Sequence, residues 1–212
     1  MRHKISFLCI LLGLILLLGA VGLTGYFLLE NHAAGSAAAK MAEQLVFETA
    51  AVTQTVERPP SRQEIPDYVL DSNMEMPTAV VDGHDCIGVV EIPKLDKRLP
   101  VISRWNYDDL RIAPCRYDGS AYDGSLIIAA HNYAAHFGSL STLQIGDRVT
   151  FTDMDGNVFS YDVIDMTTIS PNAVEQFYEG NWDLTLFTCT FGNTYRVVVR
   201  CRLLPNLSTP VS

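Results

Sequence analysis

The fold is decided by Asp183-Leu-Thr-Leu-Phe-Thr-Cys189 and, across a Gly-Asn turn, by Tyr195-Arg-Val-Val-Val-Arg-Cys-Arg-Leu-Leu204. Both runs are apolar and rich in β-branched residues, which favours the two strands of a hairpin. Side chains alternate between the faces of a strand. If Cys189 lies across from Arg196, one face is apolar and forms the core: Leu184, Leu186, Val197, Val199, Cys201 and Leu203. Cys189 and the arginines then lie on the other, open face, and a slip of one residue would reverse the faces.

Other short strands precede this hairpin. We expect strands or strand-like runs at Cys86–Ile92, Arg98–Ile102, Ser125–Ala130, Arg148–Thr152 and Val158–Ile169. The first two read as a hairpin, and so do the last two, which flank the turn Asp153-Met-Asp-Gly-Asn157. Ser170 is expected to cap a short helix with Pro171 at its first position. Many short strands with few helices indicate a mostly β fold, either a barrel or a sandwich.

The N-terminal segment Ile5–Leu29 is apolar and carries no charged side chain. A helix of this length rises about 37 Å, which is enough to cross a hydrocarbon core of about 30 Å. Arg2 and Lys4 before it place the N-terminus in the cytoplasm, so the rest of the chain would be extracellular. A cleaved signal peptide is the alternative, with Ala33–Ala39 as the source of a cleavage site.

These signals divide the chain into five regions. We predict a cytoplasmic N-terminus at 1–4, a transmembrane signal-anchor helix at 5–29 and a stalk and linker at 30–76. A catalytic domain at 77–205 and a C-terminal tail at 206–212 complete the chain. The net charge of −9 argues against nucleic acid as a partner, because binding to its phosphates requires clustered Lys and Arg.

Cys189, His131 and Arg196 are the candidate catalytic residues. Each is expected at a strand end, and together they supply a nucleophile, a proton donor for a leaving amine and a positive group for an oxyanion. The spacing of the five cysteines shows no zinc pattern and supports no disulfide, so we interpret Cys189 as the free reactive thiol and the others as small apolar residues. For each candidate taken alone, a structural role is the alternative.

These segments resemble the sortase family of cysteine transpeptidases. Thr185-Leu-Phe-Thr-Cys189 matches the family's TLxTC signature, Asn193–Arg200 resembles its strand with the essential arginine, and Leu126–Asn132 resembles its histidine segment. Ile87–Leu95, followed by Leu99–Ile102, is similar to the family's first hairpin. The resemblance covers residues 86–204 in the family's order.

The resemblance implies a closed eight-stranded sortase-type β-barrel with short helices, preceded by the transmembrane helix. It implies that Cys189 is the nucleophile, His131 the acid and base, and Arg196 the stabiliser of oxyanion or substrate. The implied reaction cleaves an LPxTG-like C-terminal sorting signal through a thioester. The protein is then transferred to an amine, commonly that of a peptidoglycan precursor. The implied partners are therefore surface proteins with a sorting signal and an amine acceptor.

Some features depart from the family pattern. Ala130 stands where the family has glycine before the histidine, and an Asp-Pro-aromatic lid motif is absent, which disfavours pilin polymerisation. Segment 170–182 is short, so a class D-like enzyme is our interpretation. No cofactor is expected, and no metal, since Asp153, Asp155 and Asn157 fit a hairpin tip.

Two alternatives to a transpeptidase stay open. A cysteine hydrolase would use the same residues with water as the acceptor. A catalytically silent, membrane-tethered binding module would instead leave Cys189 buried or not activated.

Overall fold

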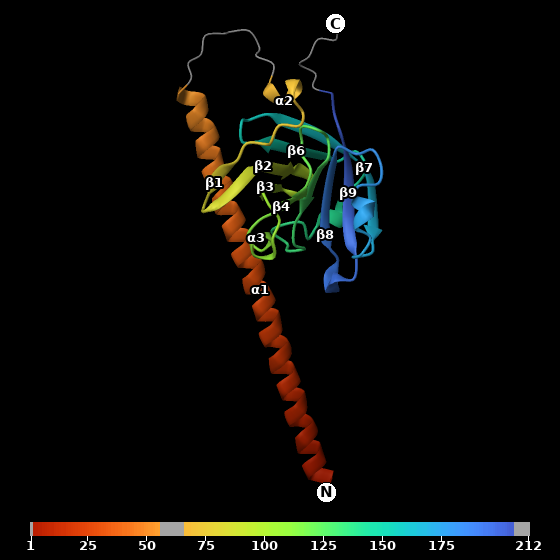
Figure 1. Cartoon of the computed structure of the whole chain (residues 1–212). Coiled ribbons are helices and arrows are strands. Elements are labelled where there is room, and N and C mark those ends of the chain that lie inside the picture. The colour runs from red at the N-terminus through yellow and green to blue at the C-terminus, as the bar shows by residue number, and fades with distance from the viewer. Residues whose placement is uncertain (1, 56–65, 206–212) are drawn as a thin grey trace. The chain divides into compact units, whose positions relative to one another are not determined.

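The computed structural model describes residues 2–55 and 66–205 of the chain. The chain divides into two compact units between Ala33 and Ala34, and Figure 1 shows their helices and strands. Residues 56–65 of the predicted linker and the predicted tail 206–212 lie outside the described residues.

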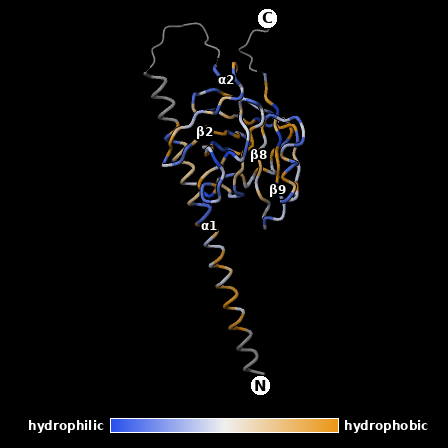
Figure 2. The backbone as a smooth tube through the Cα atoms, viewed as in Figure 1, coloured by the Kyte–Doolittle hydropathy of each residue, from blue (hydrophilic) through white to orange (hydrophobic). Residues whose placement is uncertain are grey.

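The first unit consists of the N-terminal part of helix α1 (Arg2–Thr55). The part of α1 from Ile10 is long and apolar enough to be a candidate membrane span, and it is the single such helix in the described part of the chain. Its large apolar side chains from Ile10 to Leu29 are exposed, and Figure 2 shows the hydrophobic stretch. An apolar surface of this kind fits burial in lipid.

The second unit is built on a nine-stranded sheet. Its strands are β1 (Ala79–Val81), β2 (His84–Ile92), β3 (Lys97–Ile102), β4 (Cys115–Asp118), β5 (Leu126–Ala129), β6 (Arg148–Asp153), β7 (Val158–Ile169), β8 (Leu184–Cys189) and β9 (Arg196–Leu203). The order is β1-β2-β3-β4-β5-β8-β9-β7-β6, and β6 pairs again with β2. Eight strands, β2 to β9, thus close into a barrel, and β1 is added at its edge. The predicted closed eight-stranded barrel is confirmed.

The last hairpin has the register expected from its sequence. Cys189 pairs with Arg196, and Leu184 pairs with Cys201 at the other end of β8. Leu186 and Val199 lie with these core residues inside the barrel and are fully buried. The two predicted hairpins earlier in the chain, β2 with β3 and β6 with β7, also pair antiparallel.

A second apolar layer covers the outside of the barrel. It includes Cys86, Cys115, Ala129 and Phe187, each on an outward face of its strand. The part of α1 in the second unit carries a buried stripe at helical spacing, of which Met41 and Leu45 belong to this layer: Ala34, Ala38, Met41, Ala42 and Leu45. Residues 34–45 of the predicted stalk therefore pack on the barrel, while the exact boundaries of stalk and domain stay a prediction.

The short helices differ from expectation in one place. Ser170 caps no helix: its carbonyl accepts from the backbone N–H of Ala173 and closes a turn, because Pro171 and Asn172 prefer turn geometry. A 3₁₀ helix, η3 (Val174–Phe177), follows instead. Other short helices are α2 (Asp67–Leu70), η1 (Pro93–Leu95), α3 (Tyr107–Leu110), η2 (Leu140–Thr142) and η4 (Phe191–Asn193).

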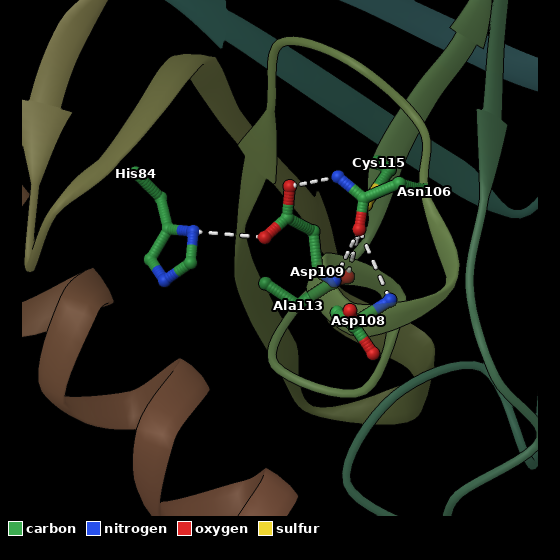
Figure 3. A network of polar contacts seen from close by, with 6 residues as sticks. All are labelled: His84, Asn106, Asp108, Asp109, Ala113 and Cys115. Carbon is green, nitrogen blue, oxygen red and sulfur yellow. Dashed lines mark hydrogen bonds and ion pairs between the residues drawn. The ribbon is translucent and has the colours of Figure 1, made fainter.

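Helix α3 is held by a polar network that the sequence did not reveal (Figure 3). The side chain of Asn106 accepts hydrogen bonds from the backbone N–H groups of Asp108 and Asp109, which caps the helix. Asn106 also donates to the carboxylate of Asp109, whose other oxygen lies 3.0 Å from Nδ1 of His84. The network ties the start of β2 to the connection between β3 and β4.

Candidate active site

Cys189 ends strand β8 and faces Arg196, the first residue of β9. Both side chains are half-buried. The other described cysteines, Cys86, Cys115 and Cys201, are free and fully buried, as the sequence predicts for small apolar residues. Burial raises the pKa of the Cys86 and Cys115 thiols to about 12, so these thiols are neutral and unreactive at physiological pH.

His131 lies two residues beyond the end of β5. Strands β5 and β8 pair in parallel, with Ala129 level with Phe187. The joint continues past the strand end, because Ala130 N–H donates to the Phe187 carbonyl at 3.1 Å and Thr188 Oγ1 donates to the Ala130 carbonyl at 2.8 Å. His131 follows Ala129 by two residues, and Cys189 follows Phe187 by two residues. The backbone register thus brings all three predicted site residues to one edge of the barrel.

The segment after His131 folds into a compact turn. The Tyr133 ring lies 4.8 Å from the His131 ring and 5.5 Å from the His136 ring, measured between centroids. The backbone N–H of Phe137 donates to the carbonyl of His131. Gly138 must lack a side chain, since a Cβ there would lie 2.7 Å from the Tyr133 carbonyl oxygen. The turn gives the candidate histidine a packed support.

His136, which the sequence analysis missed, is the buried end of this support. Its side chain is fully buried, and this burial, followed by the nearby charge of His131, lowers its pKa to about 4. Lys97 adds to the lowering, while backbone groups of Ala34 and Ile112 oppose it. His136 is therefore neutral at physiological pH. One signal could have found it: a histidine five residues after His131 within an otherwise small and apolar stretch.

We expect His136 to make the fold acid-sensitive. In the unfolded chain its pKa returns to about 6.5, so between pH 6.5 and 4 the unfolded state binds more protons and stability falls as the pH is lowered. Relative to its value above pH 6.5, the free energy of unfolding should fall by roughly 3 kcal/mol as the pH is lowered through 4. Denaturant unfolding at a series of pH values, compared between wild type and His136→Asn, measures it. Identical pH slopes in the two proteins would contradict the prediction.

The face that carries Cys189 is less open than the sequence suggests. Val198 is fully buried and the Arg200 side chain is only 11% exposed. The cause is the connection between β7 and β8, residues 170–183, hereafter the wall loop. Its Phe177 ring lies 4.4 Å from the ring of Phe187, and the Tyr117 ring meets Phe187 edge-on at 5.2 Å. The prediction that all the arginines lie on an open face is therefore wrong for Arg200, because the wall loop covers it.

Next to these aromatic rings lies a polar pocket of about 380 Å³, lined by Ser103, Arg104, Trp105, Arg116, Tyr117, Asp118 and Gly119. It contains none of the three predicted site residues. We therefore place the candidate chemistry at Cys189 and not in this pocket.

In the acidic turn between β6 and β7, both carboxylate oxygens of Asp153 accept hydrogen bonds from protein groups. Oδ1 of Asp153 accepts hydrogen bonds from the backbone N–H groups of Asp155 and Asn157, at 3.0 and 2.8 Å. Oδ2 accepts from the Tyr122 hydroxyl at 2.7 Å and from the Asn157 side chain at 2.8 Å. The carboxylate of Asp153 thus organises the hairpin tip. This agrees with the interpretation of the sequence as a turn.

Comparison with known proteins supports the resemblance found in the sequence. A family model described as the Sortase domain matches residues 90–204, which is more than half of the chain. Comparison with curated proteins gave no match.

Solved structures share the fold. Sortase C1 from Streptococcus suis is 27% identical, with a TM-score of 0.52, and the match covers 59% of this chain and 76% of that one. A sortase C1 from Streptococcus agalactiae is 25% identical, with a TM-score of 0.51 and coverage of 57% and 71%. A sortase D5 transpeptidase from Clostridium perfringens is 21% identical, with a TM-score of 0.51 and coverage of 66% and 94%, and this likeness concerns the fold alone.

Proposed function

Because the chain belongs to the sortase family, we propose that it is a membrane-anchored cysteine transpeptidase with Cys189, His131 and Arg196 as its catalytic residues. The observation that carries the proposal is the register of β5, β8 and β9. In this register Cys189 pairs with Arg196, and His131 follows the end of β5, which pairs in parallel with β8. The three segments that resemble the family's signature contribute these strand ends.

In the proposed reaction, the Cys189 thiolate attacks the carbonyl carbon of the threonine in an LPxTG-like sorting signal. A tetrahedral intermediate forms, and the Arg196 guanidinium donates hydrogen bonds to its oxyanion. The C–N bond then breaks, and His131 gives a proton to the leaving amine. The product is a thioester between Cys189 and the surface protein.

The second half of the reaction reverses these roles. An acceptor amine loses a proton to His131 as it attacks the thioester carbonyl. The C–S bond breaks, the Cys189 thiol is restored, and the surface protein becomes joined to the acceptor. We propose a peptidoglycan-precursor amine as the acceptor. This agrees with an anchor at α1, which would hold the enzyme at the outer face of the cell membrane as a single-pass protein.

The choice of sortase class stays a prediction. The class D-like interpretation depends on the short wall loop and on the missing lid motif. The sortase C1 structures matched at 25% identity or more give this class D-like interpretation no support.

The proposal is tested by a ligation assay. The full-length protein in detergent is given a library of sorting peptides, with and without an amine such as triglycine, and the products are identified by mass spectrometry. We expect amine-dependent ligation after the threonine of one motif. Cleavage with water alone, unaffected by the amine, would support the hydrolase alternative. The absence of both products over the whole library would contradict the proposed function.

A further inference from the structure

The wall loop, residues 170–183, borders the face on which the proposed chemistry takes place. Its Phe177 packs on Phe187, which stands two residues before Cys189 on the same strand and the same face. A peptide that reaches the Cys189 thiol along this face must therefore pass the wall loop.

Arg200 of β9 contacts the wall loop at two points and strand β7 at a third. Its Nη1 donates at 2.8 Å to Oδ2 of Asp165, its cross-strand partner on β7, which lies outside the wall loop. Its Nη2 donates to the backbone carbonyl of Gln176 inside the loop at 2.8 Å. The guanidinium carbon lies 4.1 Å from the ring centroid of Trp182, at the end of the loop. One side chain thus connects the middle and the end of the wall loop to strands β7 and β9.

This arrangement requires an arginine. A planar guanidinium can donate in two directions within its plane while it stacks on an indole face, and a lysine ammonium cannot. The position of the Trp182 ring also depends on a nearby glycine. Gly180 has φ of +117°, and a Cβ at this position would lie 2.0 Å from the Trp182 ring. The absence of a side chain at Gly180 therefore leaves the space that the Trp182 ring occupies.

A second contact fastens the outer side of the loop. The hydroxyl of Tyr178 donates to Oδ2 of Asp118 on β4 at 2.7 Å. Tyr117, the neighbour of Asp118, packs on Phe177 and Phe187. The wall loop is thus attached to β9 on one side and to β4 on the other.

The Arg200 contacts are a costly way to gain stability. Nε of Arg200 and Nε1 of Trp182 are buried without a hydrogen-bond partner among the described residues. Burying such groups costs free energy, and an apolar side chain of similar size often stabilises a fold better than a buried charge does. A role in fixing geometry explains the arginine better than a role in stability alone.

We propose that Arg200 is a positioning residue that keeps the wall loop in a preformed, binding-ready position beside Cys189. The proposal rests on the proposed transpeptidase function for its kinetic readout. Its structural part, that Arg200 fixes Trp182 and the loop, holds independently of any activity.

The test compares Arg200→Met and Arg200→Lys with wild type, as full-length protein in detergent. A Trp105→Phe background leaves Trp182 as the sole tryptophan. We expect Arg200→Met to raise the KM for the sorting peptide about 10-fold and to change kcat by less than about 3-fold, because the chemical groups are untouched. Acrylamide quenching of Trp182 should increase about twofold as the loop loosens. Arg200→Lys keeps the charge near Asp165, so its KM should lie between those of Arg200→Met and wild type.

Arg148→Gln is the matched control, because it also removes an arginine–aspartate pair, with Asp162 at 2.9 Å, but on the β6–β7 ribbon. It should leave KM and quenching unchanged. If Arg200→Met does not fold by circular dichroism, Tyr178→Phe replaces it: that change removes a single hydroxyl from a half-exposed ring and should raise the KM about 3-fold.

The outcomes separate the two proposals. Unchanged quenching of Trp182 in folded Arg200→Met would overturn the proposal that Arg200 positions the wall loop. Increased quenching with an unchanged KM would overturn it as well. A fall in kcat at constant KM would also overturn it, because that would place Arg200 in the chemical step. If wild type ligates no peptide, the proposed function fails, while the quenching experiment still decides whether Arg200 fixes the loop.

Discussion

Cys189→Ala should abolish ligation. Without the sulfur no thioester can form, and we expect the rate to fall by about 10⁴-fold or more, as for other enzymes that lose their nucleophile. The substitution removes one atom from a half-buried position at a strand end, so the fold should persist. The assay is ligation of the preferred sorting peptide to an amine, followed by chromatography and mass spectrometry. In wild type, the acyl-enzyme should appear as a mass added to the intact protein and should be absent from the variant.

Cys86→Ala provides the matched control. Cys86 is fully buried in the outer apolar layer, and burial keeps its thiol protonated. This variant should ligate at close to the wild-type rate and lose about 1 kcal/mol of stability at most. If Cys189→Ala ligated as wild type does, or if Cys86→Ala were the inactive variant, the assignment of the nucleophile would be wrong.

Arg196→Ala should produce the second-largest loss. A guanidinium opposite the thiol can stabilise the oxyanion in both halves of the reaction, and removal of one such donor typically costs about 10²- to 10³-fold in kcat. Arg196→Lys keeps the charge without the planar fork and should recover only a small part of the rate. Single-turnover formation of the acyl-enzyme measures the effect directly.

The form of the kinetic change is decisive for Arg196. A role in the transition state lowers kcat and kcat/KM together, whereas a role in peptide binding alone raises KM at constant kcat. Arg202→Gln, on the same strand and more exposed, is the control and should keep the wild-type kcat. Normal turnover in folded Arg196→Ala would remove Arg196 from the mechanism.

The sequence predicted the barrel well wherever local patterns carry the information. The alternation in Leu184–Cys189 and Arg196–Leu203 specified the pairing and most of the core face, because a slip of one residue would have moved every side chain to the other face. Leu203 was expected in the core but is 39% exposed, since it lies at the end of β9. The hairpin turns at 93–97 and 153–157 were equally readable, since their turn residues have strong local preferences.

Long-range features could not be predicted in the same way. The closure between β2 and β6, and the edge strand β1, depend on segments that carry no mutual signal in a single sequence. The cover over Arg200 was missed because it comes from a loop, and strand alternation describes only the two faces of a strand, without saying what lies above them. The burial of His136 depends likewise on packing between distant segments.

The parallel pairing of β5 with β8 has a consequence for the order of events during folding. The histidine and the cysteine segments are separated in the chain by the whole β6–β7 ribbon, so they meet only after a large loop has closed. Contacts of this separation are late and slow to form. A partly folded chain can therefore hold Cys189 beside Arg196, which the short β8–β9 hairpin brings together, before His131 reaches them. The proposed acid and base of the reaction would thus join the thiol only when β5 pairs with β8.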